Sequence, residues 1–289
     1  MRRSVIEHDP AVKRIIKFAL EEDLGFGDLT TDAIVSQEAN GQATLVAREE
    51  LVLAGLPIFG MVFFEISPEI ESEVYYREGD FVPAGKNVCV VKGPLSSILK
   101  GERTALNFLQ RMSGIATLTR QYVERAGPSK VRVLDTRKTV PGLRVLDKYA
   151  VRIGGGFNHR FGLFDGILIK DNHIAAAGSI TKAVQLTKKN APHTVRVEVE
   201  VEDLAGVREA VKAGVDSILL DNMQPGEVKK AVELVNGRVI LEASGGINLD
   251  IIEDMAKTGV DFVSIGALTH SAKAADFSLE IISEPGGTP

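Results

Sequence analysis

The chain has 289 residues and a formal net charge of −5 at pH 7, with 44% hydrophobic and 25% charged residues. This length can bury one large core or two moderate ones, and the composition is ordinary for a globular enzyme. The negative charge argues against nucleic-acid binding through a broadly basic surface. The single cysteine, Cys89, excludes an intrachain disulfide and a cysteine-based zinc site, and its apolar neighbours predict an inert buried thiol.

Two features bear on membrane association. The N-terminal stretch up to Arg14 lacks the apolar segment of a signal peptide. The longest uncharged apolar run, from Leu51 to Phe64, contains Pro57 and is shorter than the roughly 20 residues that a membrane span needs. These features predict a soluble cytoplasmic protein.

The N-terminal third predicts a small α+β domain. Apolar residues recur at helical spacing over 10–24. The stretch GDLTTDAI, residues 27–34, reads as a loop whose Asp28, Thr30 and Thr31 cap the next element or reach a ligand, capping being the commoner use. A strand-like segment, a helix and a hairpin follow, at 42–55, 57–66 and 71–93.

A long helical region follows, from Leu95 to about Arg125, with an apolar stripe along one face. Gly101 and Gly114 interrupt the region, so two helices or one broken helix are expected. Arg103 lies beside the stripe, where an exposed helical ion pair with its neighbour is the simplest interpretation.

After Lys130, apolar strands alternate with amphipathic helices, which predicts parallel βαβ units. Charged or small residues at the strand ends recur about every 22 residues, which favours a β/α barrel over a doubly wound sheet. A seventh strand is possible at 151–153, a last helix is expected over 272–282, and the final seven residues are expected to fray. The six clear strands are expected at 131–135, 165–171, 194–201, 217–222, 239–244 and 262–267.

A dense cationic segment lies between two of these strands, from Leu134 to Ile174. In a chain of negative net charge, cations beside apolar strands predict a cleft that collects anions. The basic residues of the segment are Arg137, Lys138, Arg144, Lys148, Arg152, His159, Arg160, Lys170 and His173. Each histidine could be a ligand or a base, although a lone histidine is more often a hydrogen-bonding residue.

The expected carboxyl ends of the strands carry the candidate chemistry, as they do in β/α barrels. The glycine turns after two strands could hold a phosphate through backbone N–H groups, although such glycines can also serve only to make tight turns. Glu200 and Asp221 beside a phosphorylated ligand suggest Mg²⁺. For Glu198 and Glu202, structural ion pairs are the stronger interpretation. The strand-end residues are Arg137, Lys138, Lys170, Glu200, Asp221, Ser244, Gly245, Gly246 and Gly266.

Several long motifs resemble quinolinate phosphoribosyltransferase, the decarboxylating pentosyltransferase of NAD biosynthesis. They are GDLTTDAI, GERTALNFLQRMSGIAT, LDTRKTVPGLR, GGGFNHRFGLFDGILIKDNHI, EVEVE, ILLDNM, EASGGI and SIGALTHS. The resemblance implies an α/β fold, with an N-terminal α/β sandwich domain over 1–114, joined by the tail 271–289, and an incomplete β/α barrel over 115–270. It also implies a homodimer with shared active sites, Mg²⁺, and conversion of quinolinate and phosphoribosyl pyrophosphate to nicotinate mononucleotide, pyrophosphate and CO₂.

The resemblance also implies residue roles. Arg137, His159, Arg160 and Lys170 would hold the two quinolinate carboxylates, and Arg103 would enter the neighbouring subunit's site. Lys138 would meet the pyrophosphate, whereas Glu200 and Asp221 would serve the ribose hydroxyls and the metal; these three would be the catalytic residues. The other substrate-binding residues would be Thr136, Ser244, Gly245, Gly246, Ile265, Gly266 and Ala267.

Three alternatives stay open from the sequence. A paralogue associated with molybdenum uptake would keep the phosphate loops and change the cations. A nicotinate phosphoribosyltransferase would need only one carboxylate clamp. A non-catalytic binder of phosphorylated ligands would have to explain Glu200 and Asp221, because a pure anion site would avoid carboxylates.

Overall fold

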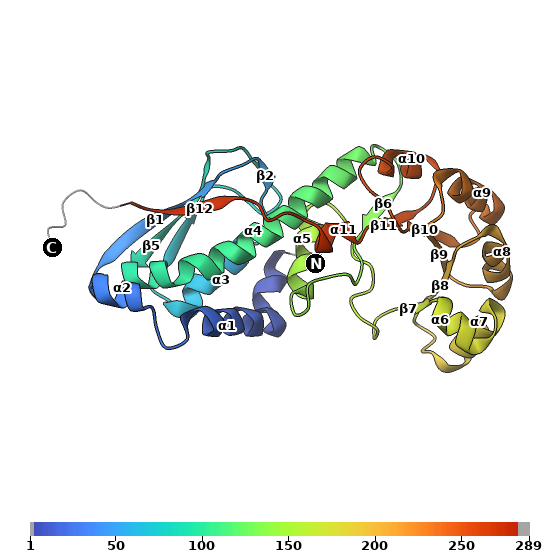
Figure 1. Ribbon diagram of the computed structural model, residues 1–289, viewed down its shortest axis with the longest axis horizontal. Helices are drawn as coiled ribbons and strands as arrows, with labels where there is room; N and C mark the ends of the chain where they lie inside the picture. The colour runs from blue at the N-terminus through green and yellow to red at the C-terminus, as the bar shows by residue number, and fades with distance from the viewer. Residues whose placement is uncertain (1–2, 283–289) are drawn as a thin grey trace. The chain divides into compact units, whose positions relative to one another are not determined.

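The structure is a computed structural model that describes residues 3–282, and the chain forms two compact units (Figure 1). The first unit contains the described residues up to 118, residues 140–155, and those from 272 onward. The second contains residues 119–139 and 156–271. Residues 140–155, which the predicted barrel domain of 115–270 includes, therefore group with the first unit.

The first unit is built on a four-stranded antiparallel sheet in the order β12-β1-β5-β3. A separate short ladder pairs β2 with β4. The hairpin expected over 71–93 is therefore only partly right, since β3 pairs with β5 while β4 leaves the sheet to pair with β2. The strands are β1 (Asn40–Ala47), β2 (Leu51–Val52), β3 (Glu71–Val74), β4 (Phe81–Val82), β5 (Asn87–Pro94) and β12 (Phe277–Ile282).

The tail of the chain forms β12 rather than the expected last helix. Phe277 and Leu279 are buried and alternate with more exposed residues, which is the two-residue period of a strand. Register with β1 runs from Gln42 opposite Ile282 to Ala47 opposite Phe277. The apolar residues over 272–282 fit both the helical and the strand period. The edge of β1 that β5 leaves open favours the strand, because β12 can pair with it. The fraying expected for 283–289 lies outside the described residues.

The helices of the first unit are a 3₁₀ helix η1 (Arg3–His8), α1 (Pro10–Leu24), α2 (Leu29–Ile34), α3 (Leu56–Ile66) and α5 (Arg144–Ile153). GDLTTDAI is mostly helix rather than loop, and the Asp28 side chain caps α2 by accepting from the backbone N–H groups of Thr30 and Thr31. The possible strand at 151–153 is wrong, because these residues are the last turn of α5. Cys89 is buried in β5, where desolvation raises its thiol pKa to about 12.

The second unit is a six-stranded parallel sheet in the order β6-β11-β10-β9-β8-β7. All six expected strands are confirmed. Among residues 3–282 no ladder joins the two edge strands, β6 and β7, so the barrel is incomplete. The strands are β6 (Arg132–Leu134), β7 (Ile167–Ile169), β8 (Val197–Val201), β9 (Ser217–Asp221), β10 (Ile240–Ser244) and β11 (Phe262–Ser264).

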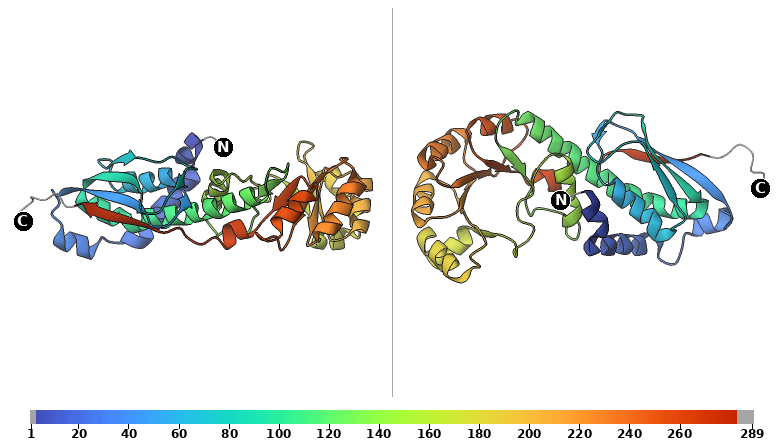
Figure 2. Two further views of the ribbon diagram at one scale, coloured as in Figure 1. Left: turned by 90° about the horizontal axis from the view of Figure 1, so that it is seen from above. Right: turned by 180° about the vertical axis from the view of Figure 1, so that it is seen from behind.

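Helices follow these strands and lie around the outer side of the curved sheet (Figure 2). Pro225 begins α9, and Gly214, Gly237 and Gly259 adopt positive φ just beyond three of the helices. Asn248 accepts from the N–H groups of Asp250 and Ile251 at the entry to α10. The helices are α6 (Asp171–Ala177), α7 (Ile180–Asn190), α8 (Leu204–Ala213), α9 (Pro225–Val235), α10 (Ile252–Lys257) and α11 (Ala267–His270).

Burial along β8 shows how the sheet directs its side chains. The three valines of the strand are buried, whereas Glu198 and Glu200 are half-buried and share the opposite face. A parallel strand covered by helices on one side must turn its other face to the interior of the barrel. Two glutamates therefore enter that interior. Within residues 3–282, no helix is long and apolar enough to cross a membrane.

The region 95–125 is one continuous helix, α4 (Leu95–Arg125), so the expected break is wrong. Its glycines allow close packing instead of a kink. A Cβ at Gly114 would lie 2.0 Å from the carbonyl oxygen of Lys273, and one at Gly101 would lie 2.8 Å from the ring of Phe63. Backbone or rings can approach the helix this closely only where no side chain projects.

Gly114→Ala should destabilise the protein by about 1–3 kcal/mol, because the added methyl group must displace backbone near Lys273. Gly60→Ala is the matched control, since Gly60 also lies inside a helix, α3, but its Cβ would meet nothing within 4 Å. The control should be neutral or stabilising by up to about 1 kcal/mol. Thermal or urea unfolding of the two variants measures both changes, and an unchanged stability of the Gly114 variant would contradict the close contact.

Candidate active site

A cavity of about 650 Å³ opens at the carboxyl ends of the parallel strands in the second unit. The sheet register explains why residues distant in sequence meet there: Ser244 on β10 lies opposite Asp221 on β9, and both strands end at that level. Predicted site residues that line the cavity are Thr136, Arg137, Lys138, His159, Arg160, Lys170, Glu200, Asp221, Ser244, Gly245, Gly246, Ile265, Gly266 and Ala267.

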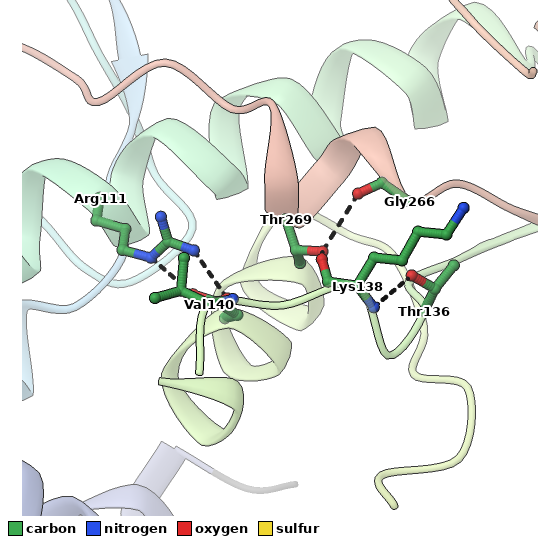
Figure 3. A network of polar contacts seen from close by, with 7 residues as sticks. Arg111, Thr136, Lys138, Val140, Gly266 and Thr269 are labelled. Carbon is green, nitrogen blue, oxygen red and sulfur yellow. Dashed lines mark hydrogen bonds and ion pairs between the residues drawn. The ribbon is translucent and has the colours of Figure 1, made fainter. Parts of the chain in front are cut away.

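Lys138 is held at the cavity by bonds to its own backbone (Figure 3). Its N–H donates to the Thr136 Oγ1 over 3.0 Å, and its carbonyl accepts from the Thr269 Oγ1 over 2.7 Å. A Cβ at Gly266 would lie 3.0 Å from the Lys138 side chain, so a bare backbone lets the two strand-end loops approach. The ammonium group is therefore carried by an ordered loop.

Two guanidinium groups, those of Arg137 and Arg160, are neighbours in the cavity. The Arg160 Nη1 donates to the carbonyl of Gly166 over 2.9 Å. Partial burial, and then the neighbouring charge of Arg137, lower the pKa of the Arg160 guanidinium, while Glu198 and Asp165 act in the opposite direction. Two guanidinium groups that repel each other in a concave site are stabilised by an anion between them.

The two acidic residues predicted to serve ribose and metal, Glu200 and Asp221, also line the cavity. The Lys170 Nζ is 2.6 Å from the Glu200 Oε2, and the Asn222 Nδ2 donates to the Asp221 Oδ2 over 2.8 Å. Asn222 has a positive φ of 56°, and a Cβ at Gly245 would lie 2.2 Å from its side-chain oxygen. Gly245 therefore leaves room for Asn222 beside Asp221. Carboxylate oxygens near a phosphate suit Mg²⁺.

A third group of titratable residues lies deeper in the barrel. The His159 Nε2 is 3.2 Å from the Glu198 Oε2 and 3.6 Å from the Glu242 Oε1. These are the three ligand-type residues whose atoms, among the described residues, converge within 4.8 Å as a metal site would require. Burial, and then repulsion from Glu198, raise the pKa of Glu242 to about 7.

Several basic residues of the segment 134–174 do not line this cavity. Arg144, Lys148 and Arg152 recur every four residues on α5, in the first compact unit, so the segment does not form one cationic cleft. His173 is exposed and accepts from the Lys170 N–H over 3.0 Å, which makes it a cap of α6. Arg103 is exposed on α4 in the part of the helix that belongs to the first unit.

Other cavity residues were not singled out from the sequence: Leu168, Leu219, Asn222, Glu242, Ile247, Ser264 and His270. Two of them carried a usable signal. Glu242 interrupts an apolar strand, and a charged residue there requires a partner inside the fold. Asn222 directly follows a strand-end aspartate, and asparagine tolerates the left-handed conformation.

Comparison with known proteins gives the family. The sequence matches the family descriptions "Quinolinate phosphoribosyl transferase, N-terminal domain" over residues 28–113 and "Quinolinate phosphoribosyl transferase, C-terminal domain" over residues 115–280. A relative from Bacillus subtilis, described as a probable nicotinate-nucleotide pyrophosphorylase (carboxylating), is 43% identical over 93% of this chain and 93% of its own length.

Two solved structures show the same fold. NadC from Streptococcus pyogenes is 45% identical, with a TM-score of 0.91 over 93% of this chain and 95% of that chain. The nicotinate-nucleotide pyrophosphorylase from Francisella tularensis is 42% identical, with a TM-score of 0.88 over 94% and 96%. The predicted incomplete β/α barrel and the predicted pentosyltransferase class are confirmed. The chain belongs to the quinolinate phosphoribosyl transferase family.

Proposed function

We propose that the cavity in the second unit transfers a phosphoribosyl group from phosphoribosyl pyrophosphate to quinolinate, with release of pyrophosphate and CO₂, to give nicotinate mononucleotide. The observation that carries the proposal is the convergence of four cationic side chains with the carboxylates of Glu200 and Asp221 on one cavity in a chain of this family. A dicarboxylate and a polyphosphate need the cations, whereas a ribose that develops positive charge needs the carboxylates.

Arg137, Arg160 and Lys170 are the proposed clamp for the two quinolinate carboxylates. All three line the cavity, and the repulsion between Arg137 and Arg160 is relieved when an anion binds. His159 was expected to join the clamp. Its Nδ1 already accepts the Arg160 N–H over 2.7 Å and its Nε2 faces Glu198, so we assign it an indirect part.

Lys138 is the proposed partner of the pyrophosphate, and the two glycine-containing loops are the proposed holders of the ribose phosphate. Gly245 and Gly246 have positive φ, and the loops 244–246 and 265–267 both line the cavity. Thr136 supports the first of these roles by accepting the Lys138 N–H. Backbone N–H groups in such turns bind phosphate without adding a side chain that would need space.

The charges suit the bond changes of this reaction. As pyrophosphate leaves, the anomeric carbon gains positive charge, and Glu200 and Asp221 stabilise that charge. The clamp holds the pyridine ring with its nitrogen towards the anomeric carbon. Once this nitrogen is alkylated, the ring cation stabilises the electron pair that CO₂ leaves on the ring carbon, and that carbon then takes a proton from water. Mg²⁺ would neutralise pyrophosphate charge when bound, and Glu200 and Asp221 are the proposed residues to hold it.

We further propose that the enzyme is a homodimer with shared active sites and that it acts in the cytoplasm. The exposed position of Arg103 on α4, outside the unit that holds the cavity, supports a role in a neighbouring subunit's site. Charged, phosphorylated substrates do not cross a bilayer unaided, so the enzyme must work in the compartment that supplies both of them.

Release of labelled CO₂ from carboxyl-labelled quinolinate tests the activity directly. We expect release that requires phosphoribosyl pyrophosphate and is lost in excess EDTA, then restored by Mg²⁺. Nicotinate in place of quinolinate should give no nucleotide. Release that is independent of the metal would reject the proposed Mg²⁺, and turnover of nicotinate without decarboxylation would reject quinolinate as the substrate.

Arg160→Ala should lower kcat/KM for quinolinate at least tenfold, since losing a charged hydrogen bond costs about 1.4 kcal/mol or more. Arg208→Ala is a matched control: the Arg208 Nη1 also donates to a backbone carbonyl, that of Leu204, but Arg208 does not line the cavity. Steady-state kinetics at varied quinolinate measure both. Equal kinetics of the Arg160 variant and the parent would reject the clamp.

Arg103→Ala and Lys138→Ala should each be nearly inactive, yet co-refolding the two should recover roughly a quarter of the parent's active sites. Half of the random dimers are mixed, and each mixed dimer has one intact shared site. Co-refolding Lys138→Ala with Arg160→Ala is the control, because both residues belong to the same cavity and no intact site can form. No recovery from verified mixed dimers of the first pair would reject the shared site.

A further inference from the structure

The imidazole of His159 lies between carboxylates from two strands that are not neighbours. Glu198 comes from β8 and Glu242 from β10, and both face the interior of the incomplete barrel. The His159 and Glu198 side chains are each 13% exposed, and the Glu242 side chain is 4% exposed. Burying charged groups to this extent costs free energy unless they have partners, so the placement of the three side chains calls for an explanation.

The hydrogen bonds of His159 fix its tautomer. The Nδ1 accepts the Arg160 backbone N–H over 2.7 Å, so it cannot carry a proton of its own. The Nε2 of a neutral ring must then be protonated, and it points at the Glu198 Oε2. A metal ion at the Nε2 would require the opposite tautomer. The cluster is therefore better suited to hold the imidazole than to bind a cation.

The backbone around His159 is tied to the edge strand β6. The Phe157 N–H donates to the Val133 carbonyl over 2.8 Å, and the Asp135 N–H donates to the Phe157 carbonyl over 3.1 Å. The buried Asp135 carboxylate accepts the His159 N–H over 2.9 Å. The imidazole thus connects a segment beside β6 to β8 and β10, across the interior of a barrel whose edge strands do not pair within residues 3–282.

Arg160 is the next residue, and its backbone N–H binds the His159 ring directly. Its guanidinium lines the cavity. A tilt of the imidazole would therefore move the backbone from which the guanidinium projects. We propose that Glu198 and Glu242 are positioning residues that, through His159, hold Arg160 in place to bind a carboxylate of the substrate. This inference rests on the proposed function, in which Arg160 is part of the dicarboxylate clamp.

Glu242 can serve this role with a neutral side chain. Its Oε1 is buried without a hydrogen-bond partner, and burial raises its pKa to about 7. A protonated glutamate is close in shape and polarity to glutamine. Glu242→Gln should therefore keep the imidazole in position, whereas Glu242→Ala removes the wall against which it packs.

The test compares Glu242→Ala, Glu242→Gln and Glu198→Ala with the parent, each also combined with Arg160→Ala. The two alanine variants should raise the quinolinate KM at least about fivefold and leave the phosphoribosyl pyrophosphate KM within about twofold. Glu242→Gln should stay within about twofold for both substrates. On the Arg160→Ala background the same substitutions should have no further effect on quinolinate, because the residue through which they act is gone.

The outcomes separate the two proposals. If Arg160→Ala leaves the quinolinate KM unchanged, the clamp itself is wrong. If Arg160→Ala raises the quinolinate KM, and adding Glu242→Ala to that variant raises the KM again by the same factor as in the parent, the clamp stands and the positioning role is rejected. If the alanine variants raise the KM for both substrates equally, the positioning role is rejected in favour of general destabilisation. Failure of both alanine variants to fold would reject it as well. Glu202→Ala, an exposed glutamate just after β8, should match the parent throughout.

A cation on the cluster is the competing result. The bound metal of the purified protein is measured after addition of Zn²⁺ and Mn²⁺. We expect the parent, Glu242→Ala and Glu202→Ala to bind the same amount, because no ion occupies the cluster. A stoichiometric ion that is lost in Glu242→Ala but kept in Glu202→Ala would overturn the positioning role and the assigned tautomer together.

Discussion

The parallel register of one six-stranded sheet is the constraint on which the site depends. Because the strands run in one direction, their carboxyl ends reach the same edge, and residues separated by more than a hundred positions in sequence line one cavity. Ser244 lies opposite Asp221 for this reason alone. A slip of one residue in any of these strands would turn its functional side chain towards the covering helices.

The interior of the incomplete barrel contains a group of polar side chains. In a closed barrel, branched apolar side chains fill the interior in layers. Here β6 and β7 remain edges in the described part of the chain, and Glu198, Glu242, His159 and Asp135 occupy the interior instead. The contacts of the His159 imidazole with Glu198 and Glu242 connect β8 with β10, and the hydrogen bond from the His159 N–H to Asp135 connects both to the end of β6.

Glycine has a different purpose at different places in the chain. Gly245 and Gly246 adopt positive φ at a strand end, where the turn itself requires glycine. Gly114 and Gly101 lie inside one continuous helix, where neighbouring backbone and rings occupy the space of a side chain. Close packing against these two glycines explains why the region 95–125 is one continuous helix, α4, although its glycines predicted a break.

The sequence by itself determined the six parallel strands, the capping aspartate Asp28, the resemblance to the family and most residues of the cavity, because strand period, turn chemistry and strand-end position are local properties. Only the tertiary structure decided that the tail 277–282 is a strand, that Arg144 and Lys148 belong to the unit without the cavity, and that His159 meets Glu198 and Glu242. Each depends on which distant edge, surface or side chain lies alongside, and spacing along the chain does not carry that information.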